Sequence, residues 1–194
     1  MRTLSKLFVL AASVAISTSL AYADTLGVGQ ISIDGFGVSY TPATSTSPGM
    51  VSFTGGTAGN GYGSLAGFDG GAVNFGSTGT VTLDIATENL ANPMELLTIT
   101  EGTSVLTYYL DAITMASNSG GDISLNTAGY FTDSGPTGDT NGSFDFTTQG
   151  TTGEATSYSG TGDIAPEPSS LLLFGTGLLG AAGIARRKFA ARFV

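Results

Sequence analysis

Hydrophobic and polar residues alternate with a period of two along the middle of the chain. Ile31 and Ile33 flank Ser32, and the same alternation recurs at residues 36–40 and 81–85. This period is typical of β-strands that bury one face, whereas an amphipathic helix repeats its apolar positions with a period near 3.6. The pattern predicts further strands at residues 50–54, 96–100, 105–115, 123–125, 129–132, 143–148 and 155–159.

Glycine-rich and polar clusters separate these segments and predict turns. The turn clusters lie at residues 44–49, 55–63, 70–71, 118–122 and 133–142. Residues 86–97 leave room for a short helix, which Asn92 and Pro93 would interrupt. Many short strands joined by glycine-rich turns predict an all-β fold, either an antiparallel β-sandwich or a jelly roll.

Two of the predicted strands assign side chains to faces. Residues 104–116 form the longest candidate strand, which we expect to be central, and its alternation puts Tyr108 and Tyr109 on opposite faces. Phe144 and Phe146 are separated by one residue, so we expect both to be buried on one face.

The N-terminus has the pattern of a secretory signal peptide. Arg2 and Lys6 precede an apolar run at residues 7–16, which is shorter than the ~20 residues that a membrane span needs. An uncleaved N-terminal anchor is the alternative, and both interpretations imply export. The small-x-small pattern of the expected cleavage site, and the mature N-terminus after it, are formed by Ala21, Ala23 and Asp24.

The C-terminus has the pattern of a single membrane span. Residues 169–185 carry no charge and would form a helix about 26 Å long, a minimal length for a hydrocarbon core of ~30 Å. The basic residues that follow would stay in the cytoplasm, which places the middle of the chain outside that membrane. The basic cluster consists of Arg186, Arg187 and Lys188, and the span is preceded by Pro166, Glu167 and Pro168.

This order of segments, together with the signal peptide, resembles that of PEP-CTERM sorting-domain proteins. The resemblance covers residues 166–194. It implies that exosortase, a membrane protease and transpeptidase of Gram-negative bacteria that make exopolysaccharide and biofilm, recognises and processes the tail. By this resemblance the sorting signal consists of Pro166, Glu167 and Pro168 with Arg186, Arg187 and Lys188. A chance Pro-Glu-Pro before an ordinary anchor is the alternative.

Charge is segregated along the chain. Residues 24–165 contain fourteen of the 15 Asp and Glu and none of the 6 Lys and Arg. Such a polyanion repels nucleic acid and anionic lipid head groups and attracts cations or cationic partners, so we expect no nucleic-acid partner. The chain has no His and no Cys, which excludes Ser-His-Asp and Cys-His pairs, thiolate metal sites and disulfides.

Three kinds of chemistry remain for the middle of the chain. A calcium site would draw on oxygen ligands that cluster in one segment, although their spacing does not fit an EF-hand. A glycosidase needs only two carboxylates, but no spacing singles out a pair. A carbohydrate-binding surface would stack sugars on tyrosines. The candidate calcium ligands are Asp133, Asp139, Asn141 and Asp145, and the candidate stacking residues are Tyr40, Tyr62, Tyr108, Tyr109, Tyr130 and Tyr158.

These features predict a chain of four parts. They are a signal peptide at 1–23, an acidic, glycine-rich β-sandwich domain at 24–150, a Ser/Thr/Gly-rich linker at 151–165, and a sorting tail at 166–194 with a transmembrane helix at 169–185.

The predicted function follows from these parts. We expect a protein that is not an enzyme, with no cofactor and no assigned metal site. Exosortase would process it after an inner-membrane intermediate, and it would then lie at the cell surface or outside the cell as a structural or adhesive component of an exopolysaccharide or biofilm. Extracellular polysaccharide is its expected partner, and the membrane holds it through the C-terminal helix before processing. The alternative is a secreted carbohydrate-binding or calcium-dependent binding module.

Overall fold

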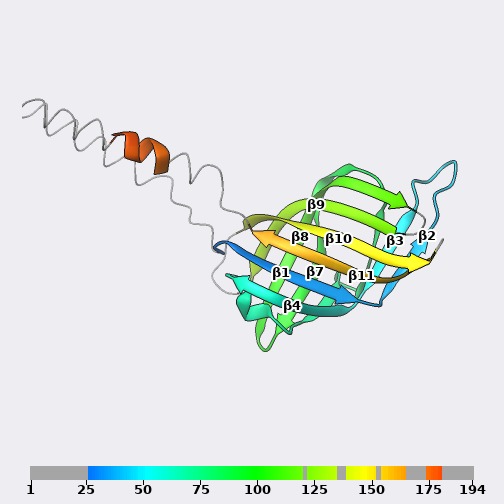
Figure 1. Ribbon diagram of the computed structural model, residues 1–194, viewed down its shortest axis with the longest axis horizontal. Coiled ribbons are helices and arrows are strands. Elements are labelled where there is room, and N and C mark those ends of the chain that lie inside the picture. The colour runs from blue at the N-terminus through cyan, green and yellow to red at the C-terminus, as the bar shows by residue number, and fades with distance from the viewer. Residues whose placement is uncertain (1–25, 120–121, 135–138, 152–153, 165–173, 181–194) are drawn as a thin grey trace, which may run out of the picture.

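The fold is formed almost entirely by antiparallel strands. The computed structural model describes residues 26–119, 122–134, 139–151, 154–164 and 174–180 (Figure 1). The strands are β1 (Gly29–Gly35), β2 (Val38–Thr41), β3 (Met50–Thr54), β4 (Gly56–Gly63), β5 (Ala72–Phe75), β6 (Thr80–Asp84), β7 (Glu88–Glu101), β8 (Ser104–Ser119), β9 (Asp122–Asp133), β10 (Thr140–Thr151) and β11 (Glu154–Ile164), with the 3-10 turn η1 (Ala66–Phe68) after β4.

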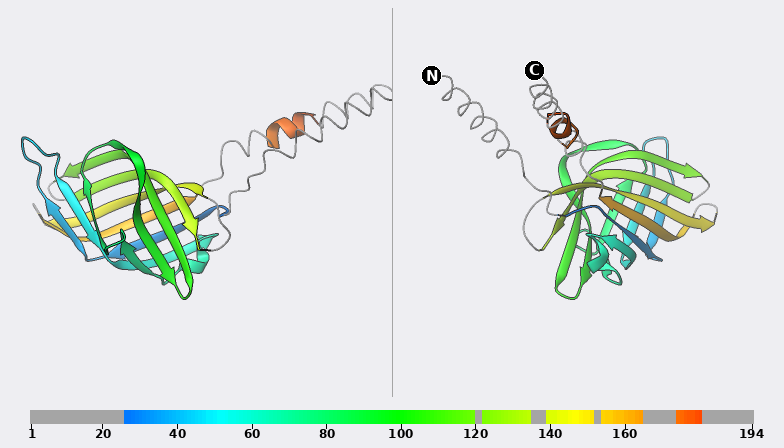
Figure 2. Two further views of the ribbon diagram at one scale, coloured as in Figure 1. Left: turned by 180° about the vertical axis from the view of Figure 1, so that it is seen from behind. Right: turned by 60° about the vertical axis from the view of Figure 1, so that its left-hand side comes forward.

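Eight of these strands close into a barrel in the order β1-β11-β10-β9-β8-β7-β5-β4. The other three form a separate sheet in the order β2-β3-β6. The views in Figure 2 show the long strands β8, β9, β10 and β11 curving around the barrel. The predicted all-β, antiparallel fold is therefore confirmed, but its main sheet closes on itself, where the sequence predicted a sandwich or jelly roll. Closure occurs because β1 pairs with β11 on one side and with β4 on the other.

The predicted linker at 151–165 is wrong over residues 154–164, which form β11, whereas the strand predicted at 155–159 lies within it. This strand pairs with β10 and β1 and completes the wall of the barrel. Its inward positions include Tyr158, Gly160 and Gly162, so the strand lacks the alternating large apolar residues by which strands are recognised. Its sequence therefore has the composition of a linker, although its inward face is buried.

The glycines of β11 make room for aromatic rings from the neighbouring strands. A Cβ added to Gly162 would lie 2.7 Å from Cε2 of Phe144, and one added to Gly160 would lie 3.0 Å from Cε1 of the same ring. Both distances leave no space for a methyl group without a shift of the ring. Small residues on β11 and large residues on β10 thus fill the barrel together, as close packing requires.

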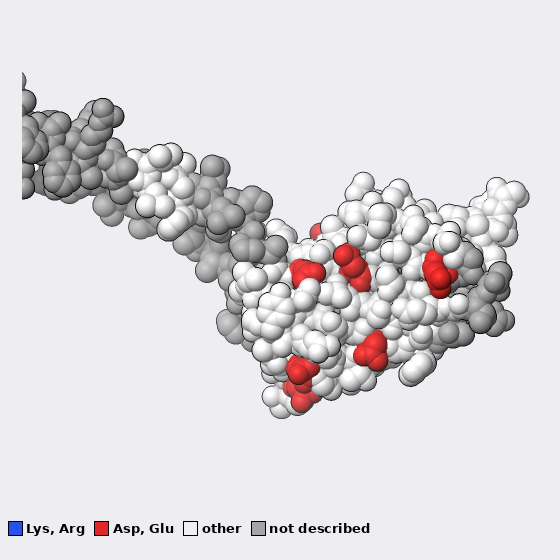
Figure 3. All heavy atoms as spheres, viewed as in Figure 1, with Lys and Arg blue, Asp and Glu red and all other residues white. Residues whose placement is uncertain are grey.

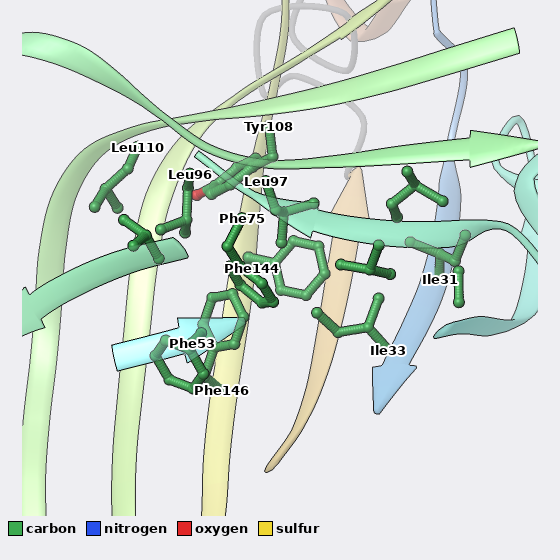
Figure 4. Close-up of a cluster of buried hydrophobic side chains, with 14 of the residues drawn as sticks. Ile31, Ile33, Phe53, Phe75, Leu96, Leu97, Tyr108, Leu110, Phe144 and Phe146 are labelled. Carbon is green, nitrogen blue, oxygen red and sulfur yellow. The ribbon is translucent and has the colours of Figure 1, made fainter. Parts of the chain in front are cut away.

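The interior of the barrel is filled by aromatic side chains. Phe53 of the three-stranded sheet lies 5.4 Å from Phe75 and 5.3 Å from Phe146, measured between ring centroids. Tyr158 packs edge-on against both Phe53 and Phe75. Figure 4 shows that Phe53, Phe75 and Phe146 come together from different strands. The three-stranded sheet is therefore joined to the barrel by one continuous core that includes Phe144.

The predicted strands are mostly extended in the structure. The prediction at residues 50–54 coincides with β3, and those at 123–125 and 129–132 merge into the single strand β9. Residues 88–101 form β7, so the alternative of a short helix at 86–97 is wrong. The pairing of β7 with β8 is irregular between Asn89 and Met94, where the Asn-Pro sequence lies.

The predicted membrane span coincides only in part with residues that the structure describes. Residues 174–180 are helical. In the part of the chain that the structure covers, no helix combines the length and the apolar character that crossing a membrane requires. The rest of the predicted span, 169–173 and 181–185, and the predicted signal peptide at 1–23 lie outside the described residues.

Candidate functional sites

The residues of the predicted processing signals lie outside the described ranges. These are Ala21, Ala23 and Asp24 at the N-terminus and Pro166, Glu167, Pro168, Arg186, Arg187 and Lys188 at the C-terminus. The structure does describe the ends of the barrel, which adjoin these signals in the sequence. The last residue of β11, Ile164, is buried, and Leu26 donates its backbone N–H to Oγ1 of Thr140 over 3.2 Å. The folded domain therefore extends to within two residues of Pro166.

A pair of stacked tyrosines lies on the outer wall of the barrel. Tyr109 of β8 and Tyr130 of β9 are direct partners across the two strands. Their ring centroids lie 5.1 Å apart and their planes differ by 16°. Each ring is half-buried, while the neighbouring Tyr108 and Phe131 point into the core. The alternation of the two strands therefore brings the two half-buried rings together on the outer face.

The pair is continued by a polar side chain on each side. Glu95 of β7 is the cross-strand partner of Tyr109, and Asn141 of β10 is the partner of Tyr130. Because directly paired residues point to the same face, all four side chains lie in line on the outer wall. Four adjacent strands span roughly 14 Å at the usual strand spacing. We call Glu95, Tyr109, Tyr130 and Asn141 the tyrosine row.

The surroundings of the row are negatively charged. Burial raises the pKa of Tyr130, and the charges of Asp139 and Asp111 raise this pKa further. No lysine or arginine occurs between residues 24 and 165 to offset these carboxylates. On the face that Figure 3 shows, carboxylates stand without any basic neighbour among the described side chains. A cation that reached this wall would meet uncompensated negative charge.

Hydroxyl groups lie beside the row. Thr107 and Thr132 are cross-strand partners on the same face as the two tyrosines, one repeat further along β8 and β9, and both are half-buried. Together with the amide of Asn141 they offer donors and acceptors of the kind that bind polyols. The wall thus combines aromatic surface with neutral polar groups and carboxylates.

The predicted set of stacking tyrosines divides into two groups in the structure. Tyr108 and Tyr158 are buried, and the Tyr158 hydroxyl donates to the carbonyl of Gly55 over 2.6 Å. These two residues are part of the core and are not available for sugars. Tyr40 accepts a hydrogen bond from the Asn118 amide. Tyr62, 54% exposed, stands on β4, away from the row.

The predicted calcium ligands do not form a cluster. Of Asp133, Asp139, Asn141 and Asp145, the last two lie four residues apart on the outer face of β10. Within the ranges given above, no group of three or more acidic side chains is arranged to hold a metal ion.

Asp145 instead belongs to a polar patch across β10, β11 and β1. Desolvation raises the pKa of the Asp145 carboxyl, and the nearby charge of Asp163 raises this pKa further. The side-chain amide of Gln30 donates to Oδ1 of Asp163 over 2.7 Å. This patch extends the polar, acidic character of the wall beyond the tyrosine row.

The sequence alone does not predict the tyrosine row, although it does predict that the side chains of Tyr109 and Tyr130 point outward. Tyr109 is out of phase with Tyr108, and Tyr130 is out of phase with Phe131, so the alternation alone puts both on an outward face. What the sequence lacks is the register between β8 and β9, which sets the two residues opposite each other.

The barrel makes the folded domain an all-β domain, and the chain continues from its last strand into the C-terminal tail. Residues 165–188 match the family of the PEP-CTERM protein-sorting motif. The match confirms the resemblance given above, and it covers the tail and not the barrel. The chain therefore carries a PEP-CTERM sorting motif, which implies export and targeting to exosortase. No curated protein and no solved structure matches the chain.

Proposed function

We propose that this chain is a structural or adhesive component of an exopolysaccharide layer or biofilm, delivered there by exosortase. It passes through an inner-membrane intermediate held by the C-terminal helix and ends at the cell surface or outside the cell. Its role is not enzymatic. The observation that carries the proposal is the sorting motif at residues 165–188.

The position of the motif supports this proposal. The motif begins at residue 165, directly after the last residue of β11. A cut within Pro166–Pro168 would leave all eleven strands on the outer side of the membrane. The released product would then be a folded, strongly acidic barrel, which is suited to remain soluble among extracellular polymers.

The intact mass of the chain recovered from outside the native cell tests the proposal. We expect a polypeptide that begins at Asp24 and ends within Pro166–Pro168, with any attached group added to that mass. A recovered mass that still includes residues 171–194 would contradict processing and leave a plain membrane anchor. A variant in which Pro166 and Pro168 are both replaced by alanine is the matched control, and it should keep the tail.

A second candidate function is carbohydrate binding by the barrel wall. The observation that favours it is the stacked pair Tyr109 and Tyr130, whose half-buried rings lie side by side on the outer wall of the barrel. Tyrosine offers an apolar face and a polar tip, which suits it to the mixed surface of a sugar. Binding of oligosaccharides to the purified chain, lost on replacing both tyrosines, tests this candidate.

A further inference from the structure

We propose that the tyrosine row binds a polysaccharide that carries cationic amino sugars, such as a polymer with unacetylated glucosamine units. This inference deepens the proposed role in a polysaccharide layer and rests on it. It goes beyond that role by naming the ligand class and the wall of the barrel that takes it.

The charge of the barrel selects the ligand. Fourteen carboxylates and no basic residue lie between residues 24 and 165. Acidic polysaccharides are therefore repelled, whereas a polymer with ammonium groups is attracted along its whole length. This negative charge acts at the row itself, because the charges of Asp139 and Asp111 add to the effect of burial in raising the pKa of Tyr130.

The side chains of the row suit the two halves of an amino sugar. The partly exposed rings of Tyr109 and Tyr130 offer a surface for the C–H groups of the sugar and a cation–π partner for its ammonium group. Glu95 stands next to Tyr109 in the row and adds a carboxylate for the same ammonium group. The hydroxyl groups of the sugar meet Thr107 on β8 and Asn141 on β10.

The arrangement of the strands favours a glycan over a basic peptide. β8 pairs with β7 and β9, and β9 pairs with β8 and β10, so the backbone groups of both strands are already used in the ladder. An extended peptide gains most of its affinity by adding a strand to a free sheet edge, and this wall has none. The wall offers side chains only, which a polyol can use.

Binding of defined oligosaccharides to the full chain in mild detergent tests the inference. The probes are a soluble glucosamine oligomer, its N-acetylated counterpart, a glucose oligomer and a uronic acid oligomer. We expect the glucosamine oligomer to bind most tightly and the uronic acid oligomer not to bind. Replacing both Tyr109 and Tyr130 by alanine should weaken the binding of the glucosamine oligomer about tenfold. Equal binding of the N-acetylated oligomer would overturn the requirement for a cationic sugar.

Two matched controls separate a site from general attraction between polyelectrolytes. Tyr62→Ala removes an exposed tyrosine from another part of the barrel and should leave binding unchanged. Glu95→Gln and Asp84→Asn each remove one negative charge, but Asp84 lies on β6 of the separate sheet. Glu95→Gln should weaken binding more than Asp84→Asn. Equal effects of the two variants, or an oligolysine that binds as tightly and depends on the same tyrosines, would overturn the inference. Far-ultraviolet circular dichroism of every variant establishes that the barrel is folded.

Recovery of the chain from native cells and binding by the purified chain together distinguish this inference from the proposed function. If the wild-type chain is recovered from the matrix of the native cell but the purified chain ignores glucosamine oligomers, the ligand class is wrong and the matrix role stands. If no processed chain is found outside the cell, the matrix role fails whatever the purified chain binds. Processed chain outside the cell together with tyrosine-dependent binding supports both.

Discussion

Gly29, the first residue of β1, lies directly opposite Ile164, the last residue of β11, in the seam that closes the barrel. The ends of the folded domain therefore leave the barrel at the same rim. The sorting motif begins at the residue after Ile164, so no spacer separates the seam from the signal. Processing at Pro166–Pro168 would leave every pair of this seam in place.

Removal of the tail should leave the barrel stable, whereas removal of β11 should not. We expect a chain from Asp24 to Ile164 to unfold cooperatively, and a chain from Asp24 to Gly150 to lose its fold. Without β11 the strands β1 and β10 become unpaired edges, and the aromatic core is exposed where Tyr158 packed. Thermal unfolding followed by circular dichroism compares the two. Cooperative unfolding of the shorter chain would show that β11 is a linker after all.

The fold could be predicted from sequence where the inward positions carry large apolar residues. The segment 50–54 was predicted with its observed bounds because Val51 and Phe53 alternate with polar residues. Only residues 155–159 of β11 are predicted as a strand, because its further inward positions are Gly160 and Gly162, whose place in the core depends on rings from β10. Closure of the barrel depends on this strand, so it could not be predicted either.

Adding a methyl group at Gly162 should destabilise the barrel. Its Cβ would meet Cε2 and Cδ2 of Phe144 at 2.7 and 2.9 Å. We expect Gly162→Ala to lower the free energy of unfolding by about 1–3 kcal/mol, the usual cost of overpacking a core. Urea unfolding of the purified chain measures this change.

Two further variants separate overpacking from other effects of the added methyl group. Gly67→Ala lies in η1, where an added Cβ meets nothing within 4 Å, and should change the free energy of unfolding by less than about 0.5 kcal/mol. Phe144→Leu makes room at the same place, so combining it with Gly162→Ala should cost less than the sum of the two single changes. Additive costs would contradict a direct clash.

The buried tyrosines should resist ionisation until the barrel unfolds. Burial raises the pKa of Tyr108 and, together with the charge of Asp34, that of Tyr158. A raised pKa in the folded state means that stability is fully present below the pKa of the unfolded tyrosine, about 10, and is lost as the pH rises above it. We therefore expect alkaline unfolding, coupled to ionisation of these two residues.

Ultraviolet absorbance of tyrosinate during an alkaline titration measures this coupling. Tyr108 and Tyr158 should ionise in one step that coincides with loss of the fold. Ionisation of all tyrosines in a single phase before unfolding would contradict the burial of the two rings.

The candidate sites differ in how far sequence could define them. The sorting tail depends on residues that are contiguous in the chain, so Pro166 to Lys188 could be recognised without a structure. The tyrosine row joins Glu95, Tyr109, Tyr130 and Asn141 from four strands, and only their register sets them in line. The alternation within each strand predicts which side chains point outward. The alignment of these side chains depends on the register between the strands, which only the fold shows.

A chain of buried hydrogen bonds joins three strands inside the barrel and should show an asymmetric response to mutation. Oγ1 of Thr127 donates to the carbonyl of Phe144 over 2.7 Å, so the Tyr108 hydroxyl, 2.9 Å from the same oxygen, acts as the donor to it. Tyr108→Phe removes one donor and leaves the bond from Thr127 to Phe144 intact. We expect it to cost about 0.5–1.5 kcal/mol, the net value of one hydrogen bond.

Thr127→Val should cost more, about 1–3 kcal/mol, because it deprives the buried Tyr108 hydroxyl of its acceptor. Valine has nearly the shape of threonine, so the loss reflects the hydroxyl and not a cavity. The double variant should cost less than the two single variants added together, since removing both partners leaves no buried hydroxyl without a bond. Urea unfolding of the three variants measures this coupling. Equal costs for the two single changes would show that Tyr108 has another acceptor, and strict additivity would show that the two hydroxyl groups do not act as one chain.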